Sequence, residues 1–160
     1  MNQRILEKLK AFSASSIVES NEFRGDLTVV VRPEDIVRIC LFVRDDQDLA
    51  FDLLVDLCGV DMYRPEGRFE VVYNLYSLKN KTYLRLKVRL DAEDPVVDTV
   101  CPVWSGANWH ERETFDMFGI VFKGHPDLRR MYMPEEYEYY PLRKDYPLMG
   151  VPDAIPLPRK

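Results

Sequence analysis

The sequence contains few of the residues on which metal and redox chemistry depend. Its 160 residues include two histidines and three cysteines. Cys40, Cys58 and Cys101 are widely spaced and form no CxxC pair, so they cannot supply the four ligands of an ordinary iron–sulfur cluster. An odd number of cysteines without a secretory signal indicates reduced thiols in the cytosol.

Long apolar runs and an excess of positive charge are also missing. The longest apolar run, Ile39–Val43, is far shorter than the roughly 20 residues that cross a bilayer. The N-terminus lacks the apolar region of a secretory signal. We therefore expect any membrane association to be indirect. The net charge of −5, from 22 basic and 27 acidic residues, disfavours a general nucleic-acid binder.

Several catalytic motifs are incomplete. His110-Glu111 begins an HExxH zinc motif, but Thr114 stands where the second histidine is required. Gly119 and Gly124 have the spacing of a phosphate-binding loop, without the Lys-Ser/Thr that must follow. Neither GxGxxG nor GxSxG occurs. These patterns indicate no catalytic, cofactor-binding or metal-binding residue in the chain.

The hydrophobic pattern predicts an α+β domain. Residues 69–75 and 84–90 alternate apolar with polar residues and form a hairpin, and the β-branched segment 27–31 forms a further strand. Helical spacing of apolar residues occurs at 5–12, 36–43, 49–57, 94–100 and 108–119. This arrangement favours a small mixed sheet with flanking helices.

One face of the hairpin is strongly basic. Arg85, Lys87 and Arg89 alternate with buried-type residues along the second strand. One side of the strand is therefore buried and the other meets solvent or a partner. A solvated sheet face is the simpler interpretation.

The helix predicted at 108–119 has clear end signals. Asn108 can cap its first turn, with Glu111 at the third position of a capping box. Gly119 is a natural stop.

Carboxylates cluster on this helix. Glu111, Glu113 and Asp116 could serve as the acid–base pair of a glycosidase. A structural interpretation is stronger, because acidic residues near a helix N-terminus suit its dipole and Arg112 can pair with Asp116 at i, i+4.

Proline divides the chain into two parts. Residues 1–120 contain four of the eleven prolines, and residues 134–160 contain six. We predict a compact domain over 1–120, followed at 121–160 by a motif-rich loop and an extended proline-rich C-terminal arm. The arm is rich in tyrosine and arginine, which protein–protein contacts favour. We therefore predict that it lies on another subunit; the alternative is an arm folded back over its own sheet.

Four blocks of sequence carry a family resemblance: Trp109–Ile120, Phe122, His125–Arg130 and Pro141–Pro147. Together they resemble the signature of the 30 kDa subunit family of respiratory complex I, known in bacteria as the C subunit of NADH–quinone oxidoreductase. One departure is Tyr139-Tyr140, which stands where family members commonly have Gly-His.

The resemblance implies a function and a set of interface residues. It implies a subunit without a cofactor in the hydrophilic arm of a proton-translocating NADH–quinone oxidoreductase. Such a protein docks on the 49 kDa-type subunit, near the small iron–sulfur subunit and other hydrophilic-arm subunits, which hold the iron–sulfur clusters and flavin. It is peripheral, on the cytoplasmic side of the bacterial inner membrane. The signature residues are Glu111, Arg112, Glu113, Asp116, Gly119, His125, Pro126, Leu128, Arg129, Arg130, Pro141, Leu142, Arg143, Lys144 and Asp145.

Two alternatives stay open. Related subunits occur in membrane-bound hydrogenases and in complexes fed by ferredoxin. A stand-alone enzyme would use Glu111, Glu113 and Asp116 instead.

A hypothesis about side-chain pairing follows from the charges. We expect Glu111 and Glu113 to bind arginines of the following loop, namely Arg129, Arg130 or Arg143, because the guanidinium group binds carboxylates bidentately.

Overall fold

The computed structural model describes residues 1–151, and its centre is a five-stranded mixed sheet. The strands are β1 (Ile17–Phe23), β2 (Asp26–Val31), β3 (Leu53–Asp61), β4 (Phe69–Ser77) and β5 (Thr82–Leu90). Their order is β1-β2-β5-β4-β3; β2 and β5 are parallel, and the other neighbours are antiparallel. The predicted α+β class with a small mixed sheet is confirmed, and so is the hairpin, formed by β4 and β5.

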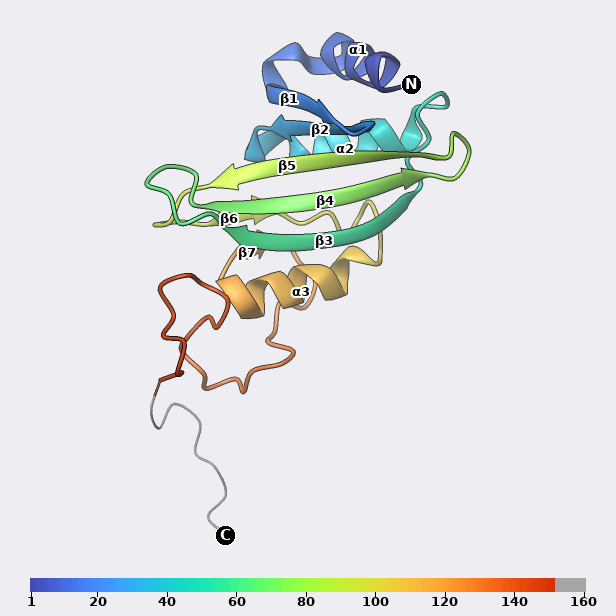
Figure 1. Ribbon diagram of the computed structural model, residues 1–160. Helices are drawn as coiled ribbons and strands as arrows, with labels where there is room; N and C mark the ends of the chain where they lie inside the picture. Colours follow the sequence, from blue (N-terminus) through green and yellow to red (C-terminus); the bar gives the residue numbers. More distant parts are fainter. Residues whose placement is uncertain (152–160) are drawn as a thin grey trace.

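Two helices form the core with one face of the sheet. α1 (Asn2–Ser13) contributes Ile5 and Leu9, and α2 (Ile36–Asp45) contributes the apolar stripe predicted for it. Short 3₁₀ turns, η1 (Ala14–Ser16) and η2 (Pro33–Asp35), precede β1 and α2. α2 lies behind the sheet in Figure 1, so the viewer sees the opposite face, in front of which the described chain places no helix.

Two predicted helices are wrong. The segment 49–57 contributes instead to the edge strand β3, and the segment after Asp94 contains β6 (Val96–Asp98). β6 pairs in parallel with β7 (Val121–Lys123) to make a second, two-stranded sheet. The register of β3 shifts between Leu54 and Asp56, so the buried Leu54 and Leu57 are three positions apart, which is a helical spacing. α3 (Ala107–Phe118) packs against this strand.

The chain after β7 has irregular structure. Residues 124–151 contain no helix or strand and form loops beside α3 (Figure 1). This segment is bonded to its own domain: Leu142 N–H donates to Met117 O at 3.2 Å, and Lys144 N–H donates to an Asp61 oxygen at 2.8 Å. The arm thus folds back on its own domain as far as residue 151, and residues 152–160 of the predicted arm lie outside the described residues. In the described part of the chain, no helix combines the length and apolarity that crossing a bilayer requires.

Candidate interaction site

Asp116 organises the start of the arm. Its side chain points from α3 into the protein and is fully buried. Its carboxylate accepts the backbone N–H groups of Met131, Tyr132 and Met133 at 3.0, 2.7 and 3.0 Å, and the Arg130 guanidinium at 2.7 Å. Burial alone would raise the pKa of Asp116, but these hydrogen bonds outweigh it and lower the pKa. The aspartate therefore acts as an ionised anchor for the turn at 130–133.

Arg143 fixes the second half of the arm. Its Nε donates to the Phe118 carbonyl at 2.6 Å, at the C-terminal end of α3. Its guanidinium lies over the rings of Tyr140 and Phe69, at 4.4 and 5.1 Å from their centroids. An arginine stacked between aromatic rings and bonded to a helix end is held in one conformation. The contact joins the arm, α3 and the sheet.

Gly119 makes this contact possible. The helix ends there with φ of +72°, a left-handed conformation that favours glycine. A Cβ atom at this position would lie 2.6 Å from atoms of Arg143 and Tyr140. The expectation that Gly119 ends the helix is confirmed, and the structure adds a second requirement, the close approach of the arm.

A buried carboxylate on β3, absent from the sequence prediction, binds the end of the arm. Asp61 accepts the backbone N–H groups of Tyr63 and Lys144, both at 2.8 Å, and the Arg68 guanidinium at 2.7 Å. Arg68 also pairs with Asp145 of the arm at 2.9 Å. Burial would raise the pKa of Asp61, but Arg68 and the backbone donors outweigh it and lower the pKa to about 2.

Glu111 is buried in a hydrogen-bonded network. Its carboxylate accepts the Thr99 hydroxyl at 2.5 Å, the Val100 backbone N–H at 2.8 Å and the Cys101 thiol at 3.4 Å. Burial is the main influence on this group and raises its pKa. The predicted capping box is wrong, because Gly106 occupies the N-cap of α3 and Glu111 instead joins α3 to the segment after β6.

Cys101, Glu111 and His125 place three potential ligand atoms within 4.8 Å of one another. The hydrogen bonds of His125 argue against a metal ion there. The Asp127 backbone N–H donates to His125 Nδ1 at 2.9 Å, so the proton of the neutral ring is on Nε2, which lies 3.2 Å from the Asn108 carbonyl. Protonated Nε2 offers no lone pair to a metal, so the cluster is better explained as an internal polar network.

The predicted pairing of Glu111 and Glu113 with arginines is wrong within the described chain. Glu111 bonds to the 99–101 segment, and Glu113 is exposed. Arg129 pairs instead with Asp127 at 2.7 Å, and Arg130 pairs with Asp116. The three carboxylates of α3 also do not converge. At about 100° per residue, Glu111 and Asp116 point roughly 140° apart around the helix.

Arg112 also differs from expectation. It does not pair with Asp116; it donates to the carbonyls of Arg129 and Arg130 at 3.2 and 3.5 Å, and its guanidinium lies 5.0 Å from the Trp109 ring centroid. Among the other signature residues, Leu128 packs against the core, Pro141 is half-buried, and Pro126 and Leu142 are exposed.

The buried anchors support an exposed apolar surface. Trp109 on α3 is 62% exposed, an unusual fraction for the largest apolar side chain. The arm exposes further large side chains, and Leu148 and Met149 are almost entirely in contact with solvent. We call these residues the arm surface: Trp109, Tyr132, Tyr139, Leu142, Leu148 and Met149. The sequence pattern identifies the segment but does not distinguish its buried anchors from its exposed residues.

Comparison with known proteins identifies the family of this chain. Residues 29–152 match the family described as the 30 Kd subunit of respiratory-chain NADH dehydrogenase. The chain belongs to this family, whose bacterial members are the C subunits of complex I.

Bacterial relatives cover nearly the whole chain. It is 54% identical over 147 residues to the C subunit of NADH-quinone oxidoreductase from Roseiflexus sp. strain RS-1, covering 92% of this chain and 84% of the relative. It is 50% identical over 155 residues to the corresponding C subunit from Geotalea uraniireducens strain Rf4, covering 97% and 93%.

Solved structures share the fold. A trypsin-resistant fragment (1–134) of Nqo5 has a TM-score of 0.67 and 36% identity, covering 80% of this chain and all of the fragment. A chain of an archaeal membrane-bound sulfane sulfur reductase has a TM-score of 0.76 and covers 92% of this chain and 86% of its own length. At 23% identity, this second likeness shows the fold alone.

Proposed function

We propose that the chain is a subunit without a cofactor in the hydrophilic arm of a proton-translocating NADH–quinone oxidoreductase, where it docks on the 49 kDa-type subunit. It contacts the small iron–sulfur subunit and other hydrophilic-arm subunits, and positions the quinone-reducing module. It is peripheral, on the cytoplasmic side of the bacterial inner membrane. The electrons pass through iron–sulfur clusters and flavin held by its partners.

The observation that supports docking is the arm surface. Residues 124–151 expose several large apolar side chains, yet Asp116, Arg143 and Asp61 bind this segment to the domain at 131–133 and 143–144. Rigid support for exposed aromatic and aliphatic side chains is typical of a binding surface, because a pre-ordered surface loses little conformational entropy on association. Trp109 has the character of a central anchor, with Arg112 stacked on its ring.

The chemistry of the same residues supports a positioning role rather than a catalytic one. Glu111 and Asp116 are fully buried and saturated by hydrogen-bond donors, so neither can reach a substrate. Glu113 is exposed on α3 and forms no ion pair in the described part of the chain. A carboxylate pair that converges on an open cleft, as a stand-alone hydrolase requires, is therefore not formed by these three residues.

Co-purification tests the proposal. The tagged full chain is expressed with the 49 kDa-type and small iron–sulfur subunits, as wild type, as Trp109→Ala and as Leu148→Ser with Met149→Ser. We expect the wild type to retain both partners and both variants to lose most of the 49 kDa-type subunit. Leu41→Ser, which changes an exposed leucine on α2, is the matched control. Retention of both partners by the arm-surface variants would reject this docking surface.

The identity of the co-purifying proteins also tests the assembly. In cells that produce the chain, recovery of flavin-bearing and NADH-oxidising subunits supports the NADH–quinone oxidoreductase. Recovery of hydrogenase or ferredoxin-oxidising subunits in their place would assign the chain to a relative of that complex.

A further inference from the structure

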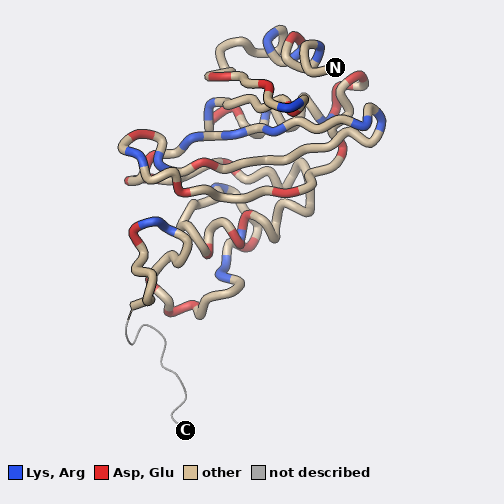
Figure 2. Tube along the Cα trace, viewed as in Figure 1, with Lys and Arg blue, Asp and Glu red and all other residues tan. Residues whose placement is uncertain are grey.

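The face of the main sheet opposite α2 has a basic centre. β5 directs Arg85, Lys87 and Arg89 toward this open face, beside Thr28 and Val30 of β2 and Asn74, Val72 and Glu70 of β4. Figure 2 shows the blue Lys and Arg positions following β5, in a chain whose net charge is −5. The predicted basic side of the hairpin is thus the surface that no helix of the described chain covers.

The cations at the centre of this face exceed the carboxylates beside them. Glu70 is 3% exposed and is shared by Arg64, Lys87 and Arg89 at 2.5, 3.0 and 3.4 Å. The other carboxylate there, Glu19, pairs with Arg89 at 2.7 Å. Around Lys87 and Arg89, three cations therefore meet two carboxylates: Arg64, Lys87 and Arg89 against Glu19 and Glu70.

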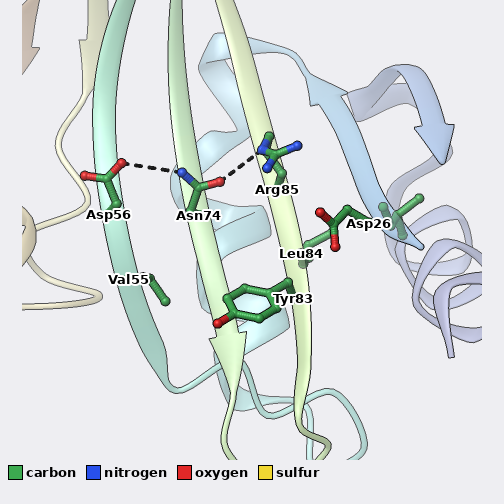
Figure 3. Close-up of a pocket in the computed structure, with 8 residues that line it drawn as sticks. Asp26, Val55, Asp56, Asn74, Tyr83, Leu84 and Arg85 are labelled. Atoms are coloured by element: carbon green, nitrogen blue, oxygen red, sulfur yellow. Dashed lines mark hydrogen bonds between the residues drawn. The ribbon is translucent and has the colours of Figure 1, made fainter. Parts of the chain in front are cut away.

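Arg85 is positioned by neutral groups alone. Its Nε donates to the side-chain amide oxygen Oδ1 of Asn74 at 3.0 Å, and Nη1 donates to the Thr28 hydroxyl at 3.4 Å. It forms no ion pair among the described residues, and Figure 3 shows its guanidinium at the end of a hydrogen-bonded chain that begins at Asp56. An arginine ordered in this way keeps donors free for a carboxylate.

Two hollows flank Arg85. One, of about 270 Å³, lies between β1 and β5 and is lined by Arg85, Lys87, Arg89, Glu19 and Phe23, among others. The second, of about 320 Å³, includes Tyr83 and Val55, which are 53% and 45% exposed (Figure 3).

The end of the open face that carries Tyr83 and Val55 also carries two aspartates. Asp26 lines the second hollow, and so does Asp56, which lies 3.5 Å from His110 Nδ1. Positive charge is thus in excess toward Arg89, and apolar surface together with negative charge lies toward Tyr83.

We propose that the open sheet face binds an acidic segment of a neighbouring protein subunit, which places a carboxylate on Arg85 and Lys87 and an apolar side chain on Phe23 and Tyr83. The one-cation excess around Lys87 and the Arg85 guanidinium, which forms no ion pair among the described residues, favour a carboxylate, and the exposed rings beside them favour an apolar anchor. This contact goes beyond the arm surface and rests on the proposed function only in placing the partner within the same assembly.

Zero-length carbodiimide cross-linking of the assembled complex tests the proposal, because the reagent joins an amine to a carboxylate in direct contact. We expect Lys87 to be joined to an aspartate or glutamate of another subunit. The intramolecular product between Lys8 and Asp48, which lie 2.8 Å apart with Asp48 half exposed, serves as an internal control for the reagent. Formation of the intramolecular product alone in the complex would overturn the proposal.

Hydroxyl-radical footprinting of the isolated chain and the complex gives a second measurement. Tyr83 and Phe23 are expected to be protected in the complex. Arg85→Gln is expected to lower the equilibrium constant for binding of the acidic segment about tenfold, because a charge-assisted hydrogen bond is lost. Arg32→Gln, at an exposed arginine 4.0 Å from its nearest acidic partner, is the matched control. Protection unchanged by Arg85→Gln would indicate an apolar occupant and overturn the acidic assignment.

The two proposals fail in different ways. Protection of Trp109 without protection of Tyr83 rejects the open-face contact alone. Equal oxidation of both residues in the isolated chain and in the purified assembly rejects the proposed function as well.

Discussion

Replacing Asp116 by asparagine should release the arm while leaving the domain folded. The carboxylate serves three backbone N–H groups and Arg130. Asparagine keeps one acceptor oxygen, but its NH₂ group then faces donors and Arg130 loses its counter-charge. Breaking a buried charged pair costs about 3–5 kcal/mol. The free energy of opening the arm should therefore fall by about 3 kcal/mol, which corresponds to about a 100-fold larger open population.

Limited proteolysis with trypsin measures this opening. Residues 124–151 of the arm contain four cleavage sites, after Arg129, Arg130, Arg143 and Lys144. When opening is in rapid equilibrium, the cleavage rate follows the open population. We expect cleavage in Asp116→Asn to be about 100-fold faster than in wild type. Far-UV circular dichroism should be unchanged, because residues 124–151 contain no helix or strand.

A matched variant separates the anchor from a simple change of charge. Glu113→Gln also removes one negative charge from α3, but Glu113 is exposed and forms no ion pair among the described residues. Its cleavage rate should equal that of wild type. Equal rates for Asp116→Asn and Glu113→Gln would refute the assignment of Asp116 as the anchor of the arm.

Three further outcomes are expected. Gly119→Ala should destabilise the protein by about 1–3 kcal/mol in chemical denaturation, because φ there is +72° and the new Cβ would lie 2.6 Å from Arg143 and Tyr140. Gly106→Ala, with open space around it, should be near neutral. Equal effects of the two substitutions would contradict this explanation. Because the pKa of Asp61 is lowered to about 2, the stability that its ionised form contributes is present above pH about 4 and lost as pH falls toward 2. Asp61→Asn should remove this acid dependence. A variant with the pH profile of the wild type would contradict the role given to Asp61. Arg143→Lys should speed tryptic cleavage of the arm even though the charge is kept, because lysine cannot stack on Tyr140 and reach the Phe118 carbonyl as the planar guanidinium does, whereas a wild-type rate would show that charge alone suffices.

Local patterns in the sequence predict much of this fold. Alternation identifies the β4–β5 hairpin, and helical spacing with a terminal glycine identifies α3. Periodicity fails for β3, because the register shift between Leu54 and Asp56 breaks the alternation of buried and exposed positions. The strands β1 and β7 give no clear signal. β1 is mostly exposed, and β7 has three residues and pairs with a distant β6.

The sequence identifies the segments that form the candidate site, but it does not predict the contacts between them. The motif blocks mark α3 and the arm, yet they do not show that Asp116 binds three backbone N–H groups of the following loop. The Asp61 contact joins positions 83 residues apart, so no local pattern could reveal it. The pattern predicts Glu111 as a cap, because a carboxylate near a helix start has the same sequence pattern whether it faces the backbone or the protein interior.

The central claim is that the arm surface is covered by a partner subunit. The most direct measurement is the rate at which hydroxyl radicals oxidise Trp109 and Met149 in the isolated chain and in the native complex purified through a tag on this chain. Trp109 and Met149 are 62% and 95% exposed in the chain alone. We expect both to become strongly protected in the complex, while Met1, 49% exposed at the end of the molecule opposite the arm, is the reference (Figure 1). Oxidation of Trp109 and Met149 at the same rate in both samples would contradict it.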